Sequence, residues 1–410
     1  MKMFKKFLTI GALLCAAVAC VPLVVNAQPG VESDILFGGS LVLSGPSEIL
    51  GQELQAGERA YFARVNESGG VDGHHVALVT LDDHYEPNAA VTNTQKLIRE
   101  QHIFAAMGYV GTPTTLAALP ELSAAGVPLI GAFTGAKGLR EPFNRFMFNT
   151  RASYNDEGVP LAKQLAVYGK VALFVQDDAY GKAVQEAVTA GLAKYGLAPV
   201  VVVTIKRNVS GPEFQASIDR AADAIAKSGA AAVAVGSVYA PVSALMQALK
   251  DRGAPTVMAS VSFIGTTGVL QTMQRSAAGM GIVQVVPSPF NQSTELTRQF
   301  TSDMAAWREQ LLRQAHAATS KDEVARLTKL ADYAVPSYGA MEGYINARVA
   351  VEGLRHCHGT FTRERFIEGL EDLGRFDLGG FVERYSKNSH LGSTFTDLTV
   401  VSTDGKKVVQ

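Results

Sequence analysis

Short apolar runs alternate with amphipathic stretches along most of the chain, and this alternation predicts strands separated by helices. Helices of about 10–15 residues between consecutive strands are typical of βαβ units, which build a parallel sheet. In the first half of the chain we expect strands at 34–42, 76–81, 103–107 and 127–130, and helices at 48–66, at 87–100 and from Thr112 onward.

The same alternation restarts near residue 155, which predicts a second α/β half. Strands are expected at 170–175, 199–205, 231–235 and 256–259, with helices at 155–167, 180–195, 212–227 and 241–252. After 281–286 the segment Pro287-Ser288-Pro289 breaks regular structure, and the remainder is mainly helical to 373, with strand character at 379–385 and 398–401. We therefore expect an α/β protein of two doubly wound lobes, the first from 28–150 plus 287–375 and the second from 151–286 plus 376–410. No long Gly/Ser or Pro-rich linker occurs, which favours a hinge of short crossings.

The N-terminus has the pattern of an export signal. Lys2, Lys5 and Lys6 precede an apolar stretch at 7–25, and Val25-Asn26-Ala27 fits a cleavage site, so we expect residues 1–27 to be removed. Export to the periplasm follows, and a lipid anchor at Cys20 is the less favoured alternative. Removing three lysines from 37 basic residues leaves 34 against 38 acidic residues, a mature charge of −4 that gives no support to nucleic-acid binding. Cys357 is then the one remaining cysteine, so no internal disulfide is expected.

Two neighbouring strand ends are the best candidates for a ligand site. The run Met107-Gly108-Tyr109-Val110-Gly111-Thr112-Pro113 reads as a buried strand that ends in glycine, followed by a helix with Thr112 as N-cap. Free backbone N–H groups, threonine hydroxyls and the positive end of the helix dipole can hold an anion such as a carboxylate. The next strand ends in the glycine- and threonine-rich run 131–136, and the carboxyl ends of parallel strands meet at one edge of a sheet. Neither run has a nucleotide-phosphate pattern.

Other candidate chemistry is weaker. Members of the pairs Asp82-Asp83 and Asp177-Asp178 point to opposite faces of an extended strand, which favours capping and solvation over catalysis or cation binding. His356-Cys357-His358 lacks partners at metal-ligand spacing, and no Gly-x-Ser-x-Gly elbow occurs. We expect no metal, no cofactor and no enzymatic activity. Several aromatic residues near strand ends fit either the core or the walls of a ligand pocket, namely Tyr109, Phe133, Tyr180, Tyr239 and Phe263.

Several short motifs, taken in order, carry a family resemblance. They are Leu43-Ser44-Gly45-Pro46, the turn Asn66-Glu67-Ser68-Gly69-Gly70-Val71-Asp72-Gly73, Asp82-Asp83, Asp178-Ala179-Tyr180-Gly181 and Glu342-Gly343-Tyr344. Over nearly all of the mature chain, the sequence resembles the periplasmic substrate-binding proteins of branched-chain amino-acid-type ABC transporters, the Leu/Ile/Val-binding-protein-like family. The resemblance implies two Rossmann-like lobes joined by three crossings. It also implies a cleft that closes around a ligand for an inner-membrane ABC permease.

The resemblance also implies which residues bind the ligand. Thr112 falls at the family's carboxylate-binding hydroxyl, and Gly135 falls at a second hydroxyl position, where Thr134 stands beside it. The full expected set is Val110, Thr112, Phe133, Thr134, Gly135, Tyr180, Tyr239, Ser262 and Phe263. Ser262 aligns with the glutamate that pairs with the ligand ammonium in the amino-acid binders. Serine cannot neutralise a buried cation, so either Asp178 or another acid replaces the glutamate, or the ligand has no α-ammonium group.

We therefore expect a monomeric, exported solute-binding protein that takes a small carboxylate-bearing ligand, an amino acid or a similar compound. Two alternatives stay open at this point. The same fold serves as a ligand sensor that passes occupancy to a signalling partner. An exported hydrolase is a less favoured alternative, because the sequence carries no hydrolase motif.

Overall fold

The computed structural model describes residues 32–254 and 257–410, so the expected signal peptide and Cys20 lie outside the described residues. A first sheet has the strand order β2-β1-β3-β4-β5, and all of its neighbouring strands run parallel. Its strands are β1 (Glu32–Leu41), β2 (His74–Asp82), β3 (Ala105–Met107), β4 (Leu129–Ile130) and β5 (Met147–Phe148). The helices between them are α1 (Glu48–Glu67), α2 (Pro87–Arg99) and α3 (Thr112–Ala124), with a 3-10 turn at Lys137–Leu139.

A second sheet has the order β14-β13-β10-β9-β8-β6-β7. Its parallel strands are β6 (Val171–Gln176), β7 (Val201–Ile205), β8 (Ala232–Gly236), β9 (Met258–Ser260) and β10 (Gly281–Gln284). The strands β13 (Asp397–Val401) and β14 (Val408–Val409) add to it in antiparallel fashion. Its helices are α4 (Tyr154–Ala166), α5 (Ala179–Ala193), α6 (Gly211–Ser228), α7 (Tyr239–Asp251) and α8 (Thr266–Met273), with 3-10 turns at Ser262–Ile264 and Gln274–Ala277.

The chain passes between the two sheets three times. It leaves the first sheet after β5, returns after β10, and enters the second sheet again at β13. The segment between β10 and β13 holds α9 (Glu295–Ala317), α10 (Lys321–Tyr333), α11 (Tyr338–Arg355) and α12 (Arg363–Asp372). It also holds a separate hairpin of β11 (Arg375–Asp377) and β12 (Val382–Arg384). The fold of two doubly wound α/β lobes with three crossings is thus confirmed, while the expected lobe boundaries stay a prediction.

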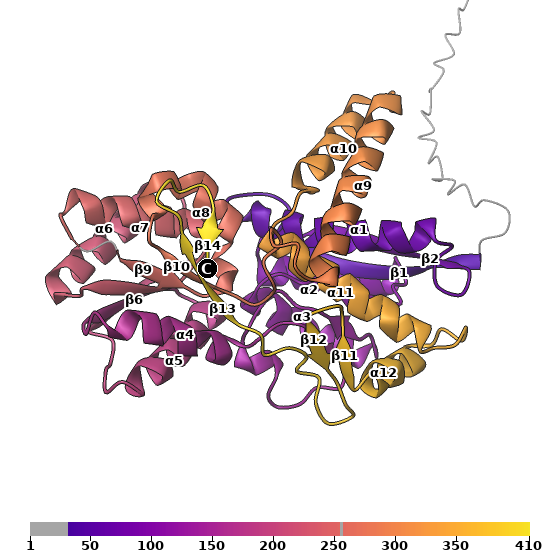
Figure 1. Ribbon diagram of the computed structural model, residues 1–410, viewed down its shortest axis with the longest axis horizontal. Helices are drawn as coiled ribbons and strands as arrows, with labels where there is room; N and C mark the ends of the chain where they lie inside the picture. The colour runs from indigo at the N-terminus through magenta and orange to yellow at the C-terminus, as the bar shows by residue number, and fades with distance from the viewer. Residues whose placement is uncertain (1–31, 255–256) are drawn as a thin grey trace, which may run out of the picture. The chain divides into compact units, whose positions relative to one another are not determined.

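Helices cover both faces of each sheet, as the apolar strand patterns require. Phe37 on β1 packs in one cluster with α1 and α11, whereas Ala106 on β3 packs in another with α2 and α3. In the second sheet, α4 and α5 lie on one face and α6, α7 and α8 on the other (Figure 1). The helices α9 and α10 pack side by side. None of the helices in the described part of the chain combines the length and the apolar character that a membrane span needs.

Two glycines allow α1 and α11 to pack with their backbones in contact. A Cβ atom on Gly57 would lie 1.8 Å from the carbonyl oxygen of Ala340, and one on Gly343 would lie 1.9 Å from that of Leu54. A side chain at either position would therefore force the helices apart. This contact gives a physical reason for the glycine in Glu342-Gly343-Tyr344.

Candidate functional site

The two predicted strand ends meet, as the sequence indicated. Val110 and Phe133 pair as a parallel bridge beyond β3 and β4. The Gly111 amide donates to the Phe133 carbonyl over 3.2 Å, and the Phe133 amide donates to the Tyr109 carbonyl over 2.7 Å. Both runs are buried, so their side chains lie inside the molecule at the carboxyl edge of the first sheet.

The helix after β3 begins one residue earlier than the sequence suggested. Gly111, not Thr112, is the N-cap of α3, with a φ of 99° that favours glycine. A Cβ atom there would lie 2.3 Å from Cε2 of Tyr85, so the ring of Tyr85 also excludes a side chain. The expected N-cap at Thr112 is therefore wrong: the N-cap is Gly111, where both the backbone and the contact with Tyr85 require glycine. No side chain caps the helix, and the Thr115 hydroxyl donates to the Gly111 carbonyl over 2.6 Å.

A short chain of hydroxyls lies at the first turn of α3. Thr112 Oγ1 and Thr134 Oγ1 are 2.6 Å apart, and Thr134 Oγ1 donates to the Tyr154 hydroxyl over 3.3 Å. Gly135 cannot carry a hydroxyl-bearing side chain here, since a Cβ atom would lie 2.6 Å from the Tyr154 amide nitrogen and ring. Thr134 is thus the residue whose hydroxyl lies beside Thr112.

A buried arginine that the sequence analysis did not single out lies next to these hydroxyls. Arg151 follows β5, at the first crossing between the sheets, and its side chain is fully buried. Its Nη2 donates to Glu157 Oε1 over 3.1 Å and to the Ser262 hydroxyl, and its Nη1 donates to Glu342 Oε1 over 3.2 Å. Glu157 Oε2 in turn accepts from the Ser262 amide over 2.6 Å. Arg151 therefore joins α4, α11 and the turn after β9.

Two carboxylates share this single guanidinium. Burial lowers the pKa of Arg151, but the charges of Glu342 and Glu157 outweigh burial and hold that pKa above its ordinary value. Burial raises the pKa of Glu342 to about 7, against the opposing effect of Arg151. Burial likewise raises the pKa of Glu157. The cluster consequently holds the arginine charged, whereas Glu342 titrates near neutral pH.

The sequence carries little signal for this cluster. Arg151, Tyr154 and Glu157 are spaced three apart, but their full burial is known only from the structure. Charged residues are almost never fully buried unless they are paired, so this burial requires partners for Arg151. The partners Ser262 and Glu342 could not be found from the sequence, because they come from distant parts of the chain.

Aromatic rings from both sheets form a group that meets the arginine at Phe133. Phe263 lies at their centre, with ring centroids 4.6 Å from Tyr180, 5.5 Å from Phe133 and 6.2 Å from Tyr85. The Arg151 guanidinium lies 5.2 Å above the Phe133 ring, a cation–π contact. The structure therefore brings Phe133, Tyr180 and Phe263 together, and it adds Tyr85 to them.

Tyr180 and Tyr239 differ in their surroundings. The Tyr180 hydroxyl is buried and has no hydrogen-bond partner. Tyr239, by contrast, begins α7 and packs on α8, where a Cβ atom on Gly268 would lie 2.2 Å from its ring. Within the described residues, no ring contact joins Tyr239 to the group around Phe263. Tyr239 thus lies apart from this group, and so does Tyr109, which packs with α2 and α3 and bonds Thr94.

The acidic pairs serve in capping, as predicted, but Asp83 is buried rather than solvated and accepts from the Ser40 hydroxyl over 2.9 Å. Asp82 Oδ1 accepts from the amides of Leu43 and His84, each over 2.9 Å. Asp178 caps α5 through the Tyr180 amide at 2.9 Å and pairs with Arg207 at 3.0 Å. Asp178 already has partners and is therefore poorly placed to receive a ligand ammonium.

One contact near the first acidic pair has the residue types of a hydrolase triad but not its geometry. Ser44 Oγ lies 2.7 Å from His84 Nδ1, and Asp82 Oδ2 lies 3.2 Å from the same nitrogen. A proton relay needs the acid and the nucleophile on different ring nitrogens. In the described ranges, no group of three or more His, Cys, Asp or Glu side chains is placed to hold a metal ion.

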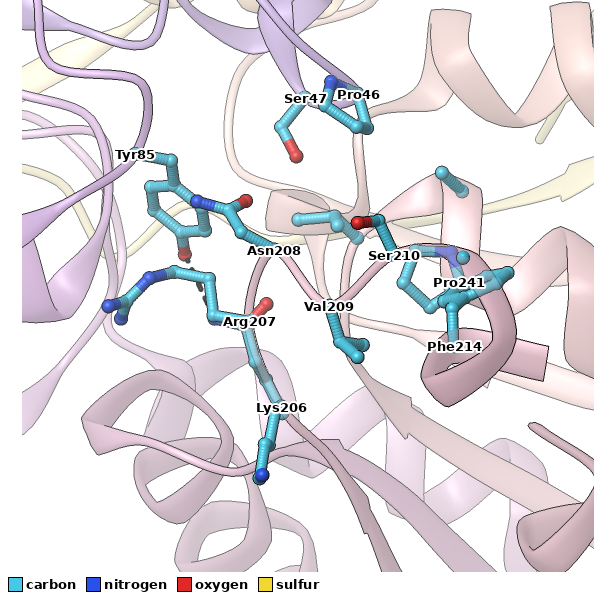
Figure 2. Close-up of a pocket in the computed structure, with 14 residues that line it drawn as sticks. Pro46, Ser47, Tyr85, Lys206, Arg207, Asn208, Val209, Ser210, Phe214 and Pro241 are labelled. Carbon is cyan, nitrogen blue, oxygen red and sulfur yellow. Dashed lines mark hydrogen bonds between the residues drawn. The ribbon is translucent and has the colours of Figure 1, made fainter. Parts of the chain in front are cut away.

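Loops of the two sheets also meet beside this site. Arg207 Nη2 donates to Glu86 Oε2 over 3.2 Å, and Asn208 donates to Glu86 Oε1 over 2.7 Å and to the His84 carbonyl over 3.0 Å. Next to these contacts is a cavity of about 280 Å³, lined from both sheets (Figure 2). The residues at this contact follow β2 and β7, so the two sheets are bridged here as well as at Arg151.

The chain is similar to known proteins in both sequence and structure. The sequence model of the family described as periplasmic binding protein matches residues 34–407. An amino acid binding protein of Pseudomonas aeruginosa is 24% identical over 280 residues, 68% of this chain and 71% of that protein. A possible leucine/isoleucine/valine-binding protein from Rhodopirellula baltica SH 1 superposes with a TM-score of 0.79 at 26% identity, covering 94% of this chain and 98% of that one. A substrate-binding periplasmic protein from Ralstonia solanacearum gives the same TM-score and identity over 92% and 100%.

Proposed function

The chain belongs to the periplasmic binding proteins, in the Leu/Ile/Val-binding-protein-like family, and on this basis we propose that it is the solute-binding component of an ABC importer. The ligand is a small carboxylate that the two lobes enclose by hinge closure and that the protein passes to an inner-membrane permease. Binding shifts the protein toward its closed form by the difference in affinity between the closed and open forms. Export by the N-terminal signal takes the protein to the periplasm.

The observation that carries this proposal is the hydroxyl pair of Thr112 and Thr134 at the first turn of α3. The two oxygens lie at a helix N-terminus whose cap is a glycine, where no side chain takes the free amides. Such a turn favours an anion, and hydroxyl donors add hydrogen bonds to it. Val110, Phe133 and Gly135 supply the backbone of the site, while Tyr180, Phe263 and the more distant Tyr239 cover the ligand from the second lobe.

The charges around Ser262 favour a ligand without an α-ammonium group. Ser262 stands where the family's amino-acid binders have an acid, and its hydroxyl accepts from Arg151. Two acids beside it, Glu157 and Glu342, are both paired with that same arginine. A third acid, Glu53, lines the small space at Ser262 and Phe133, and burial raises its pKa to about 7. A ligand ammonium at this position would meet a buried guanidinium, and an uncompensated buried charge is costly. A carboxylate with an uncharged body avoids this cost.

The experiment is a calorimetric titration of wild type and Thr112→Ala with 4-methylpentanoate, a carboxylate with no ammonium group. Loss of a hydrogen bond to a charged group weakens binding by about 1–3 kcal/mol, roughly five- to 150-fold. Thr92→Ala is the matched control, because Thr92 is exposed on α2 and its hydroxyl donates to the Asn88 carbonyl. Equal affinities for Thr112→Ala and wild type would contradict the assignment of the anion site.

A further inference from the structure

A second cavity lies at the amino edge of the first sheet, opposite the edge where Val110 and Phe133 meet. The crossover helix of a βαβ unit carries the chain from the carboxyl edge of a parallel sheet back to its amino edge. The last turns of α1, which lead into β2, therefore lie away from the expected ligand site. The cavity has a volume of about 430 Å³ and is lined by these turns and by α9 and α11, both of which pack on α1 (Figure 1).

Three arginines line this cavity. Arg64 comes from α1, and Arg348 and Arg355 come from α11. Tyr344, Arg348 and Arg355 follow one another at intervals of four and seven residues, so they share one face of α11. Packing of α11 on α1 brings this face beside Arg64, and the three guanidiniums therefore surround one hollow.

Two of the guanidiniums are exposed and only partly used. Arg64 Nη1 donates to the Ser68 hydroxyl over 3.3 Å, and its Nε lies 3.8 Å from Asp303 Oδ1. Arg355 Nη1 donates to Glu352 Oε2 over 3.0 Å. The Arg64 and Arg355 side chains are 56% and 51% exposed. A guanidinium carries five N–H groups, so bonds of this kind leave donors that a ligand can use.

The third guanidinium is held in place by the protein. Arg348 Nη1 donates to Gln299 Oε1 over 3.2 Å and to the Leu378 carbonyl over 2.8 Å. The guanidinium also lies 5.8 Å from the centroid of the Tyr61 ring, a cation–π contact. Its position is therefore set before a ligand arrives, which lowers the entropic cost of binding.

The charge of the lining is positive. Among the described residues that line the cavity, Asp303 is the one acid, and it accepts from the Tyr344 hydroxyl over 2.6 Å. Counting Glu352, the partner of Arg355, still leaves one net positive charge. Glu67 is close in sequence, but it lines the neighbouring groove between α1, β2 and α9 instead. The cavity thus favours an anion.

The number of guanidiniums favours a doubly charged oxyanion. A planar guanidinium donates two parallel hydrogen bonds to a carboxylate or a phosphate, and a monocarboxylate can accept only one such fork well. A phosphate monoester carries three terminal oxygens and close to two charges, so it can meet several guanidiniums at once. The volume of about 430 Å³ falls within the range of about 300–1,000 Å³ for small-molecule sites, which leaves room for the organic group beside Tyr61.

We infer that this cavity binds a phosphate monoester, with the phosphate among Arg64, Arg348 and Arg355. The site is separate from the proposed solute site and goes beyond the proposed function. A soluble organic phosphate and the phosphate headgroup of a membrane lipid present the same group, and the experiment distinguishes the two sources.

The first arm is a calorimetric titration of the mature chain with glycerol 3-phosphate, with glycerate as the matched carboxylate. Glycerol 3-phosphate should bind at least about ten-fold more tightly than glycerate, and less tightly at high salt. Arg64→Met should weaken glycerol 3-phosphate about ten-fold. Arg313→Met is the matched control, because it removes the same charge from an exposed position of α9 outside the cavity and should leave the affinity unchanged.

The second arm is sedimentation with phosphatidylcholine vesicles that contain phosphatidic acid, a phosphate monoester, or phosphatidylserine, which has none. Binding that requires both phosphatidic acid and Arg64 assigns the site to a lipid headgroup, and binding of glycerol 3-phosphate without vesicle binding assigns it to a soluble ester. If wild type binds neither, or if Arg313→Met weakens binding as much as Arg64→Met, the inference is overturned. Arg348→Met is the second variant, and glycerol 3-phosphate affinity equal to wild type in both pocket variants would also overturn it. Affinity for 4-methylpentanoate should stay unchanged in Arg64→Met, which keeps this test independent of the proposed solute site.

Discussion

Removing the charge of Arg151 should destabilise the protein, and the effect should depend on pH. In Arg151→Met the carboxylates of Glu157 and Glu342 stay buried but lose the guanidinium that lies 3.1 and 3.2 Å from them. Breaking a buried ion pair by removing one partner costs about 3–5 kcal/mol, because a charge is left uncompensated. We expect a loss in this range at pH 8.

The pH dependence follows from the pKa values of the two acids. With Arg151 present, burial already raises the pKa of Glu342 to about 7, and removing the cation raises it further. The folded variant can therefore take up a proton at pH 6, which neutralises the acid and lessens the penalty. At pH 8 protons are scarcer, so taking one up on the buried acid costs more free energy than at pH 6. The variant's loss of stability relative to wild type is therefore larger at pH 8.

The assay is urea unfolding of wild type and Arg151→Met at pH 6 and pH 8. Arg252→Met is the control, because Arg252 pairs with Asp219 and Asp223 at the surface and should leave the midpoint nearly unchanged. Adding Glu157→Gln and Glu342→Gln to Arg151→Met should recover much of the loss. An Arg151→Met midpoint that equals wild type at pH 8, or that shifts equally at both pH values, would refute the charge argument.

Two further perturbations test other parts of the structure. Burial raises the pKa of Glu58 to about 8, above the ordinary 4.5. Between these two values the folded state keeps a proton that the unfolded chain loses. The stability of the fold therefore falls as pH rises from about 4.5 to about 8. Glu58→Gln imitates the protonated acid, so its urea midpoint should exceed that of wild type at pH 8 and match it near pH 4.5; parallel pH profiles would count against this. Glu86→Ala removes the acceptor of Arg207 and Asn208 without altering the cavity lining. It should speed 4-methylpentanoate release several-fold in stopped-flow measurements at low salt and less at high salt, and an unchanged release rate would mean that this bridge does not hold the lobes closed.

The sheets and most helices could be predicted because their signal is local. Strand and helix periodicities are properties of neighbouring residues, and the restart near residue 155 was enough to indicate a second lobe. The convergence of Val110 and Phe133 also followed, since parallel strands must bring their carboxyl ends together. The sequence alone was therefore enough to indicate where an anion site can form.

The rest of the site depends on contacts between distant segments. The N-cap of α3 is Gly111 rather than Thr112, and the ring of Tyr85 from a distant loop lies against this glycine. Arg151 bonds partners on α4, on α11 and in the turn at Ser262, and no local sequence pattern indicates that these segments come together. Tyr239, at the start of α7, packs against α8 rather than beside Phe263, again through a contact that local patterns do not encode.

The charge of the ligand is the central claim, and a matched pair of ligands tests it most directly. L-leucine and 4-methylpentanoate share a carbon skeleton and a carboxylate, and they differ by the α-ammonium group. Calorimetric titration of the mature chain should give an affinity for 4-methylpentanoate at least about 100-fold above that for L-leucine, because a buried ammonium here would lack a partner. Tighter binding of L-leucine would contradict the account, since an acid near Ser262, such as Glu53, would then have to pair with the ligand ammonium.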